Sequence, residues 1–387
     1  MSATIRAIGT AVPTRTLEQA AVRDLFVRQP DLGRLGRRLV PAAFDASAVE
    51  HRHTVLDELD ASHAAGTFRD DAGILRSPST GTRNDRYREL APPLFVAAAQ
   101  DAVQRAGIDA TSITHVVTVS CTGFTQPGPD LDIVRELGLR PTVFRQHIGF
   151  MGCCAAFPAL RVADAFAASD PDAVVLVVCA ELCTLHVRAS DDPDQIVANS
   201  VFGDGAAAVV VTADGPGLRM DDFATTVVPE GASEMAWNIG DEGFEMVLST
   251  AVPKLVGATV AQAVGPLLPA GGAADIPVWA VHPGGRAILD RTQDALGLSD
   301  EAMGPSRAVL RDHGNMSSAT VLFVLRHALD DGVDDGTPVV ALAFGPGLTV
   351  EAARLTAVGT TPRTAVPAVT TADDRTDVLA AATAGVS

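Results

Sequence analysis

Positive charge is scarce in this sequence. Lysine and arginine together number 29 against 47 aspartates and glutamates, which gives a formal net charge of −18. A field of that sign repels nucleic-acid backbones and anionic membranes, so we expect neither as a partner. Lys254 is the only lysine. Any anionic ligand must therefore be held by arginine, whose planar fork suits phosphate.

Long apolar runs are also missing. The longest ones, such as 173–180, are much shorter than the roughly 18–20 residues that span a bilayer, and the start of the chain has no signal-type apolar stretch. The five cysteines are an odd number without a secretory context, which is typical of reduced thiols. We therefore predict a cytoplasmic protein in which at least one cysteine is reactive.

Size and hydrophobicity indicate a large folded core. The 387 residues exceed the roughly 100–200 residues of one ordinary domain. Hydrophobic residues make up 47% of the chain and charged residues 20%, a balance that buries enough apolar surface to offset chain entropy. We expect a globular protein with one large core or two fused halves.

Helical and strand patterns alternate along the chain from about residue 92. Predicted helices cover 92–107, 132–139, 153–169, 246–264, a segment following 284–290, and 315–332. Predicted strands cover 115–120, 173–182, 205–212, 277–281, 339–344 and 348–355. This alternation predicts an α/β fold with largely parallel sheets.

An internal repeat predicts where the reactive residues meet. A strand ends at Cys121, and 32 residues later Cys153 begins a helix that leads to another strand. Another strand ends near His282, and 33 residues later Asn315 begins a helix of the same kind. Two such halves bring Cys153, His282 and Asn315 together at facing strand ends and helix starts, where α/β sheets bind ligands.

The domain prediction follows this repeat. We expect an N-terminal half over 1–213 with the nucleophilic cysteine and a C-terminal half over 214–359 with the histidine and asparagine. The remaining segment, 360–387, is rich in alanine and threonine without apolar periodicity. Such a composition is typical of a mobile tail.

Cys153, His282 and Asn315 form a set suited to acyl transfer through a thioester. A helix start stabilises a thiolate, so the sequence predicts a lowered pKa for Cys153. The imidazole then pairs with the thiolate, and histidine and asparagine donors hold an oxyanion. Alternatively, Cys153 and Cys154 are buried structural cysteines and Asn315 is an ordinary helix cap.

Four sequence motifs resemble those of the type III polyketide synthases, the chalcone and stilbene synthase family. They are VFGDGAAAVVV (201–211), WAVHPGGRAILD (279–290), GNMSSATVLFVL (314–325) and AFGPGLTVE (343–351). The resemblance covers about residues 5–357, and HPGG and GPGLTVE distinguish this family from the ketoacyl-ACP synthases III. It implies a thiolase fold with two similar αβαβα halves in a five-layered core. It also implies a homodimer that acts on CoA thioesters such as malonyl-CoA, with no bound cofactor and no metal.

The resemblance also assigns roles to residues. It implies that Cys153 accepts the acyl group, and that His282 and Asn315 promote malonyl-CoA decarboxylation and hold the thioester oxyanion. Phe202 matches an aromatic gate between the CoA tunnel and the cavity, and Cys154 is structural. The implied cavity residues are Cys121, Cys183, His186, Trp237, Met246 and Ser317, together with Gly345 and Gly347 of the AFGPG segment.

The cavity departs from the plant pattern at several positions. Cys121, Cys183 and His186 stand where plant enzymes usually carry threonines, Trp237 replaces a glycine, and Met246 replaces a second gate phenylalanine. The strings SCTGF, ELCTLH and AWNIGDEGFEMVLS resemble bacterial members that make alkylpyrones or alkylresorcinols. We therefore expect an acyl-CoA starter, extension with malonyl-CoA, and closure to a pyrone or resorcinol-type ring.

Arginines in GRLGRRL are candidates for binding CoA. Arg34, Arg37 and Arg38 have i, i+3, i+4 spacing and share one face of a helix, where their guanidinium groups suit phosphates. The alternative is a solvated helix face.

Other functions use some of the same residues. A cysteine hydrolase also carries cysteine, histidine and asparagine in this order, although papain-like enzymes have the nucleophile near the mature N-terminus. A ketoacyl-ACP synthase III-like enzyme performs a single condensation. A structural zinc site would use Cys179, Cys183 and His186, but the sequence offers no paired fourth ligand.

Overall fold

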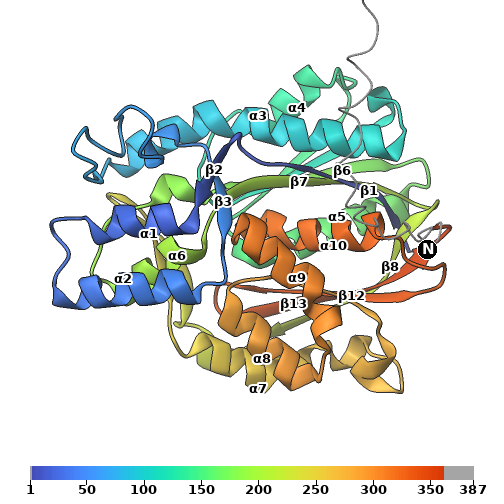
Figure 1. The fold of residues 1–387 in the computed structure, drawn as a ribbon. Coiled ribbons are helices and arrows are strands. Elements are labelled where there is room, and N and C mark those ends of the chain that lie inside the picture. Colours follow the sequence, from blue (N-terminus) through green and yellow to red (C-terminus); the bar gives the residue numbers. More distant parts are fainter. Residues whose placement is uncertain (1, 361–387) are drawn as a thin grey trace, which may run out of the picture.

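The structure, a computed structural model, describes residues 2–360 except for the side chain of Ala328. Figure 1 shows alternating layers: an outer helix, strands, two central helices, further strands and outer helices. This arrangement confirms the predicted α/β class and five-layered core. The predicted tail, apart from Thr360, lies outside the described residues.

The strands of both sheet layers join into one nine-stranded sheet in the order β11-β12-β13-β8-β1-β7-β6-β4-β5. The first layer contains β1 (Thr4–Ala11), β4 (His115–Ser120), β5 (Phe144–Gly149), β6 (Val174–Leu182) and β7 (Asp204–Thr212). The second layer contains β8 (Gly217–Val227), β11 (Val278–Val281), β12 (Pro338–Gly345) and β13 (Thr349–Val358). The layers are connected where Thr4 and Ile5 of β1 pair with β8.

The sheet is mixed, so the prediction of largely parallel sheets was wrong. Strand β4 pairs in parallel with β5 and β6, and β11 pairs in parallel with β12. Every other pair of neighbours is antiparallel. The alternating pattern suggested crossovers throughout, but β12 and β13 are joined by only three residues, which is a hairpin connection.

The parallel pairs display the predicted repeat. Strand β4 is followed by the 3-10 turn η3 (Gly152–Cys154), helix α5 (Ala156–Ser169) and β6. Strand β11 is followed by η8 (Ser317–Ala319), helix α10 (Thr320–Asp330) and β12. Helices α5 and α10 lie side by side between the sheet layers (Figure 1) and share one hydrophobic cluster. The repeat therefore places Cys153 in one of the two equivalent turns and Asn315 two residues before the other.

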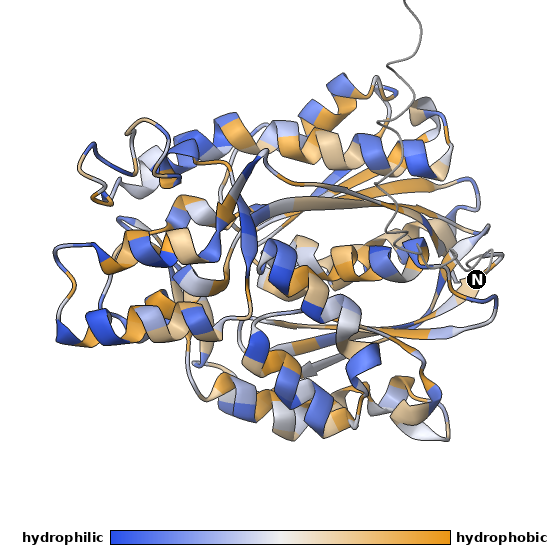
Figure 2. Ribbon diagram, viewed as in Figure 1, coloured by the Kyte–Doolittle hydropathy of each residue, from blue (hydrophilic) through white to orange (hydrophobic). Residues whose placement is uncertain are grey.

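The outer helices cover the other face of each sheet layer. Helix α3 (Thr80–Ala106) packs on β1 so closely that a side chain at Gly9 would lie 2.1 Å from the backbone nitrogen of Ala102. Helices α7 (Val252–Val264), α8 (Arg286–Leu296) and α9 (Asp300–His313) cover the second layer. Figure 2 shows that polar residues colour the solvent side of these helices. Amphipathic helices thus enclose the sheet.

Two predicted helix starts lie farthest from the observed ones. Helix α3 begins at Thr80, where the hydroxyl of Ser79 accepts from the backbone N–H of Thr82, and Pro92 and Pro93 lie inside it. Proline marks a helix start because it lacks an N–H, but it is also tolerated where packing holds the helix. Residues 246–248, predicted as helix, belong to β10 (Gly243–Leu248), which pairs with β9 (Met235–Gly240).

Four further α-helices and two short strands complete the described part of the chain. They are β2 (Arg15–Glu18), α1 (Gln19–Val27), α2 (Arg34–Ala46), β3 (His51–Thr54), α4 (Pro129–Glu136) and α6 (Pro193–Val201). Residues 121–128 form the loop before α4, so that helix begins earlier than predicted. Among the described helices, none is both long and apolar enough to span a bilayer.

Candidate active site

Cys153 lies in the turn η3, directly before α5. Gly152 has a φ of +66°, and a side chain there would lie 2.4 Å from Pro346. A side chain at Gly345 would lie 2.2 Å from the sulfur of Cys154. Each segment therefore needs a glycine where a side chain of the other packs on it. This close packing fixes the Cys153 turn against the AFGPG segment.

Asn315 brings its amide to the thiol. The sulfur of Cys153 lies 3.9 Å from both Oδ1 and Nδ2 of Asn315. Oδ1 accepts from the backbone N–H of Ser317 at 2.8 Å, and Nδ2 lies 3.5 Å from the carbonyl oxygen of Gly284. Ser317 adopts a left-handed conformation with φ +47°, which is rare outside glycine and is found at functional sites. The amide is thus oriented from its own loop.

His282 directly follows β11 and is 1% exposed. Its backbone N–H donates to the carbonyl of Leu342 at 2.8 Å, which continues the sheet pairing. Neither ring nitrogen has a hydrogen-bond partner among residues 2–360. Buried polar atoms are nearly always paired, so this imidazole is available to a bound group.

Burial determines the protonation states of Cys153 and His282. It raises the pKa of Cys153 to about 11, although the side chains of Ser317 and Asn315 lower it. It also lowers the pKa of His282 to about 3. Thiol and imidazole are therefore neutral at pH 7, and the predicted low thiol pKa and ion pair were wrong for this state. The helix-start effect is confined to the first turn and does not offset desolvation here.

Glu181, at the end of β6, ties the two halves together. Its buried carboxylate accepts from the backbone N–H of Cys121 at 2.9 Å and from the hydroxyls of Thr122 and Ser318 at 2.9 and 2.6 Å. Burial raises the pKa of this carboxyl, while these hydrogen bonds lower it. Ser318 adjoins the Ser317 turn, so Glu181 supports the Asn315 loop from the opposite sheet layer.

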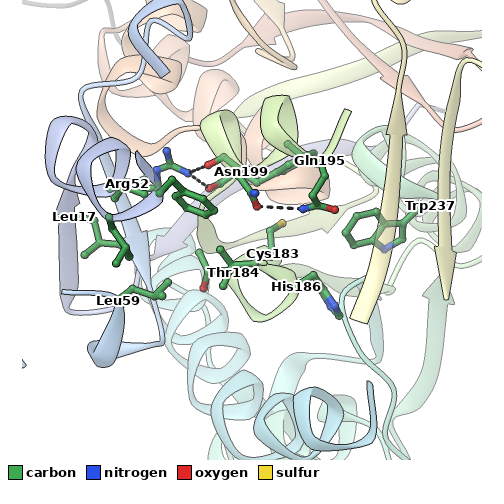
Figure 3. Close-up of a pocket in the computed structure, with 15 residues that line it drawn as sticks. Leu17, Arg52, Leu59, Cys183, Thr184, His186, Gln195, Asn199 and Trp237 are labelled. Carbon is green, nitrogen blue, oxygen red and sulfur yellow. Dashed lines mark hydrogen bonds between the residues drawn. The ribbon is translucent and has the colours of Figure 1, made fainter. Parts of the chain in front are cut away.

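A narrow apolar cavity lies between α1, α6 and β9 (Figure 3), and Cys153, His282 and Asn315 are not among the residues that line it. Predicted cavity residues Phe202, Cys183, His186 and Trp237 line it. Cys121 and Ser317 lie nearer the nucleophile, with their Sγ and Oγ atoms 3.5 Å apart. These six residues are therefore brought to one region.

The other predicted cavity residues, Met246, Gly345 and Gly347, are not among those that line this cavity. Met246 pairs with Trp237 across β9 and β10 and is not among the residues that line the apolar cavity. Gly345 packs on Cys154, as described above. Gly347 has a φ of +71°, and its N–H donates to the carbonyl of Met235 at 2.8 Å. The two glycines thus shape the turn that supports the site.

His186 is fully engaged in hydrogen bonding. Its Nδ1 accepts from the backbone N–H of Phe244 at 3.0 Å, so Nε2 is protonated and donates to the carbonyl of Thr122 at 2.8 Å. Burial lowers its pKa to about 3. Among the described side chains no cluster of three or more histidines, cysteines and carboxylates suits a metal ion. Both ring nitrogens of His186 are therefore occupied by hydrogen bonds, which disfavours the zinc-site alternative.

A second pocket of about 340 Å³ opens beside Gly284, between α2, α6, α7 and α8. Its lining is mostly apolar, and Arg286 is its one charged member among the described residues, beside the hydroxyl side chains of Ser47, Ser200, Ser249 and Thr250. The predicted CoA ligands Arg34, Arg37 and Arg38 are exposed at the other end of α2 and do not line this pocket. Arg37 instead donates to the carbonyl of Leu32 at 3.0 Å.

Sequence reasoning missed two residues of this region. Arg286 directly follows the HPGG motif, and Glu181 is a carboxylate at the end of an otherwise apolar strand. A charged residue in a buried strand is itself a signal, because burial without partners is costly. The partners of Glu181 are distant in sequence: Cys121 and Thr122 lie about 60 residues earlier, and Ser318 lies in the other half of the chain.

Comparison with known protein families follows the two halves. Residues 1–215 match the family described as chalcone and stilbene synthases, N-terminal domain. Residues 218–359 match the family described as chalcone and stilbene synthases, C-terminal domain. Together the two matches span nearly all the described residues.

Solved structures of type III polyketide synthases are similar to this chain. PKS-I from the brown alga Ectocarpus siliculosus is 29% identical, with a TM-score of 0.85 over 92% of this chain and 98% of that one. The C-terminal type III polyketide synthase domain of Steely1 from Dictyostelium is 28% identical, with a TM-score of 0.85 over 92% and 100%. The 1,3,6,8-tetrahydroxynaphthalene synthase of Streptomyces coelicolor A3(2) is 28% identical, with a TM-score of 0.82 over 92% and 99%. These similarities confirm the predicted thiolase fold.

Replacement of Glu181 tests its role as a buried acceptor. We expect Glu181→Ala to lower the free energy of unfolding by about 3 kcal/mol or more, because each buried donor left without an acceptor costs roughly 1–3 kcal/mol. Urea unfolding followed by circular dichroism measures the change. Glu245, whose partly exposed carboxylate pairs with Arg188 at 3.1 Å, is the control, and Glu245→Ala should cost at most about 1 kcal/mol. Equal effects would contradict the role of Glu181.

Proposed function

The chain belongs to the chalcone and stilbene synthase family and is a type III polyketide synthase, and we propose that it extends an acyl-CoA starter with malonyl-CoA on Cys153. Enzymes of this family use CoA thioesters and need no other cofactor. The observation that carries the proposal is the site itself: an oriented amide lies 3.9 Å from the Cys153 sulfur and 3.5 Å from the carbonyl oxygen of Gly284. Gly284 belongs to the HPGG turn of His282, whose ring nitrogens have no partner among the described residues.

In the loading step, the Cys153 thiol attacks the starter thioester while its proton passes to His282. Neutral thiol and neutral imidazole are the correct starting states for this transfer. The tetrahedral oxyanion accepts hydrogen bonds from His282 and from Nδ2 of Asn315. Collapse of this intermediate breaks the C–S bond to CoA, which leaves as a thiol with the proton from His282.

In the extension step, malonyl-CoA loses CO2, and the electron pair of the broken bond forms a thioester enolate. The enolate oxygen is held by the donors of His282 and Asn315. The enolate carbon then attacks the acyl carbonyl on Cys153 and releases the Cys153 thiolate. The lengthened chain returns to Cys153 for further rounds, and we propose that the final product closes to a pyrone or resorcinol-type ring.

The apolar cavity is our proposed site for the starter chain. It has about 40 Å³ of free volume, which suits a short acyl group in this conformation. Its lining includes four aliphatic side chains, those of Leu17, Val22, Leu25 and Leu59. The same four side chains line a third cavity, of about 340 Å³, which carries charged side chains and is distinct from the pocket beside Gly284. These four aliphatic side chains therefore form a wall that limits the acyl length.

The pocket beside Gly284 is our proposed CoA site, with Arg286 as a contact for CoA phosphate in place of the arginines of α2. Arg286 begins α8 and lines this pocket. Arginine is the natural phosphate ligand of a protein with a single lysine.

We also propose a homodimer that works in the cytoplasm. Strand β5 is an edge of the nine-stranded sheet. Phe144 at its start is 49% exposed, and Met151 just after its end is 41% exposed. An exposed apolar sheet edge favours association. All five cysteines are free thiols, as expected in a reducing compartment.

Replacement of the nucleophile separates the two half-reactions. We expect Cys153→Ala to abolish chain extension but to retain malonyl-CoA decarboxylation, because enolate stabilisation depends on His282 and Asn315. Product mass spectrometry and 14CO2 release from labelled malonyl-CoA measure the two activities.

Cys179→Ala is the control for this experiment, because Cys179 is a buried thiol of β6 that the mechanism does not use. It should retain both activities. Loss of extension and decarboxylation to the same extent in folded Cys153→Ala would contradict the assigned roles. Hydrolysis of acyl-CoA without condensation by the native enzyme would favour the thioester hydrolase, and a single condensation would favour the ketoacyl-ACP synthase III-like alternative.

Truncation of one leucine in the cavity wall tests how the starter is selected. We expect Leu59→Ala to raise the ratio of kcat/KM for a longer starter over a shorter one by about 10-fold, since a missing methylene or two in an apolar pocket changes selectivity by roughly 1–3 kcal/mol each. Octanoyl-CoA and butanoyl-CoA are suitable substrates. Leu56→Ala removes a buried leucine that lines neither cavity and should leave the ratio unchanged. The same shift in both variants would exclude the wall.

A further inference from the structure

Arg52 of β3 is a buried cation held entirely by neutral oxygens. It is 3% exposed. Its Nη1 donates to the carbonyls of Asn199 and Phe202 at 2.6 and 2.8 Å, and Nη2 donates to the carbonyl of Ser200 at 3.1 Å. Nε and Nη2 also donate to the side-chain oxygen of Gln19. Figure 3 shows the guanidinium above the end of α6.

These acceptors belong to the C-terminal turn of α6. Its last carbonyls have no helical partner and carry the negative end of the helix dipole, so a cation there is favourable. Burial lowers the pKa of Arg52 to about 9, with Asp204 opposing the shift, so the guanidinium is charged at pH 7. Gln19 reinforces the arrangement, because its Nε2 donates to the carbonyl of Ser200 at 2.8 Å. One buried guanidinium therefore fixes the backbone over residues 199–202.

The same backbone segment holds the Asn315 loop. The N–H of Asn315 donates to the carbonyl of Val201 at 2.8 Å, and the N–H of Gly203 donates to the carbonyl of Asn315 at 3.0 Å. Phe202 and Asn315 are thus paired as in a parallel bridge. Gly314 has a φ of +68°, and a side chain there would lie 2.6 Å from the carbonyl oxygen of Val201. The two backbones are in direct contact.

We propose that Arg52 is a positioning residue for catalysis: it fixes the end of α6 and thereby holds the amide of Asn315 beside Cys153 and His282. Arg52 lies one backbone segment away from the reacting atoms and acts through Phe202 and Asn315. The proposal rests on the proposed function, because it assumes that Asn315 stabilises the enolate and the oxyanion. It assigns a role in catalysis to a charged residue, Arg52, that lies outside the family motifs.

A double-mutant cycle on malonyl-CoA decarboxylation tests this role. Removal of one oxyanion donor costs roughly 100-fold or more in kcat, and we expect a loss of that size for Asn315→Ala. Small misplacements of a catalytic group cost up to about 100-fold, and we expect Arg52→Lys to lose about 10-fold, because lysine cannot bind three carbonyls in a fork. In the double variant, Arg52→Lys should cost nothing further. A purely structural Arg52 would give additive losses and would overturn the proposal.

Arg69→Lys is the matched control. Arg69 is a second buried arginine that donates to main-chain carbonyls, those of Glu58 and His63, and these carbonyls lie outside the segments that pair with Asn315. This variant should keep the native decarboxylation rate. A loss equal to that of Arg52→Lys would show a general effect of buried arginines and would contradict the proposal.

Amide hydrogen exchange gives a readout that does not depend on activity. In Arg52→Lys, the amides of Gly203 and Asn315 should exchange at least about 10-fold faster than in the native protein, with no such change in Arg69→Lys. Should Arg52→Lys fail to fold, Gln19→Met removes one acceptor of the same guanidinium and should produce the same pattern. Unchanged exchange at both amides would overturn the proposal. A native enzyme without decarboxylase activity would instead refute the proposed function, and the exchange data would still decide the role of Arg52.

Discussion

Burial of the reacting groups is the constraint on which the rest of the site depends. In water, the pKa values of a thiol and an imidazole differ by only about two units, but inside this protein desolvation moves them much farther apart and keeps Cys153 and His282 neutral. Charge therefore has to develop during the reaction, and it has to be met by groups that are already in place. Nδ2 of Asn315 is such a group, and so are the ring nitrogens of His282, which have no hydrogen-bond partner within residues 2–360. The fold is organised to hold them still.

Three sets of contacts hold these groups in place. The turns that carry Cys153 and Asn315 begin the two central helices, which pack in one hydrophobic cluster. Glu181 connects the strand ends of the first half to the Ser317–Ala319 turn of the second half. Arg52 acts from a third direction, through the backbone at the end of α6. Buried charges in this protein thus bind loop ends that apolar packing alone would leave free to move.

The sequence allowed much of the fold to be predicted. Strands β4, β6, β7 and β11 were expected within a residue or two, because each is a continuous apolar run, and the spacing of Cys153 and Asn315 revealed the repeat. The motifs around His282 and Phe202 indicated the family. Local patterns did not reveal the antiparallel pairs, the true start of α3 or strand β10, since these depend on contacts between distant segments. The predicted low pKa of Cys153 was wrong for the same reason. Its position at a helix start can be read from the local sequence, whereas its burial depends on tertiary contacts. Glu181 and Arg52 gained roles only when their partners, far away in the sequence, were in view.

Decarboxylative condensation on Cys153 is the proposed activity on which the roles of the other residues depend. Mass spectrometry of the products formed by the native enzyme tests it, with malonyl-CoA and a series of starters from acetyl-CoA to palmitoyl-CoA and a phenylpropanoyl-CoA. We expect pyrones or resorcinol-type products that contain one starter and two or more malonyl-derived units, with the best yields from short starters. Free acids and CoA without any condensed product would contradict it.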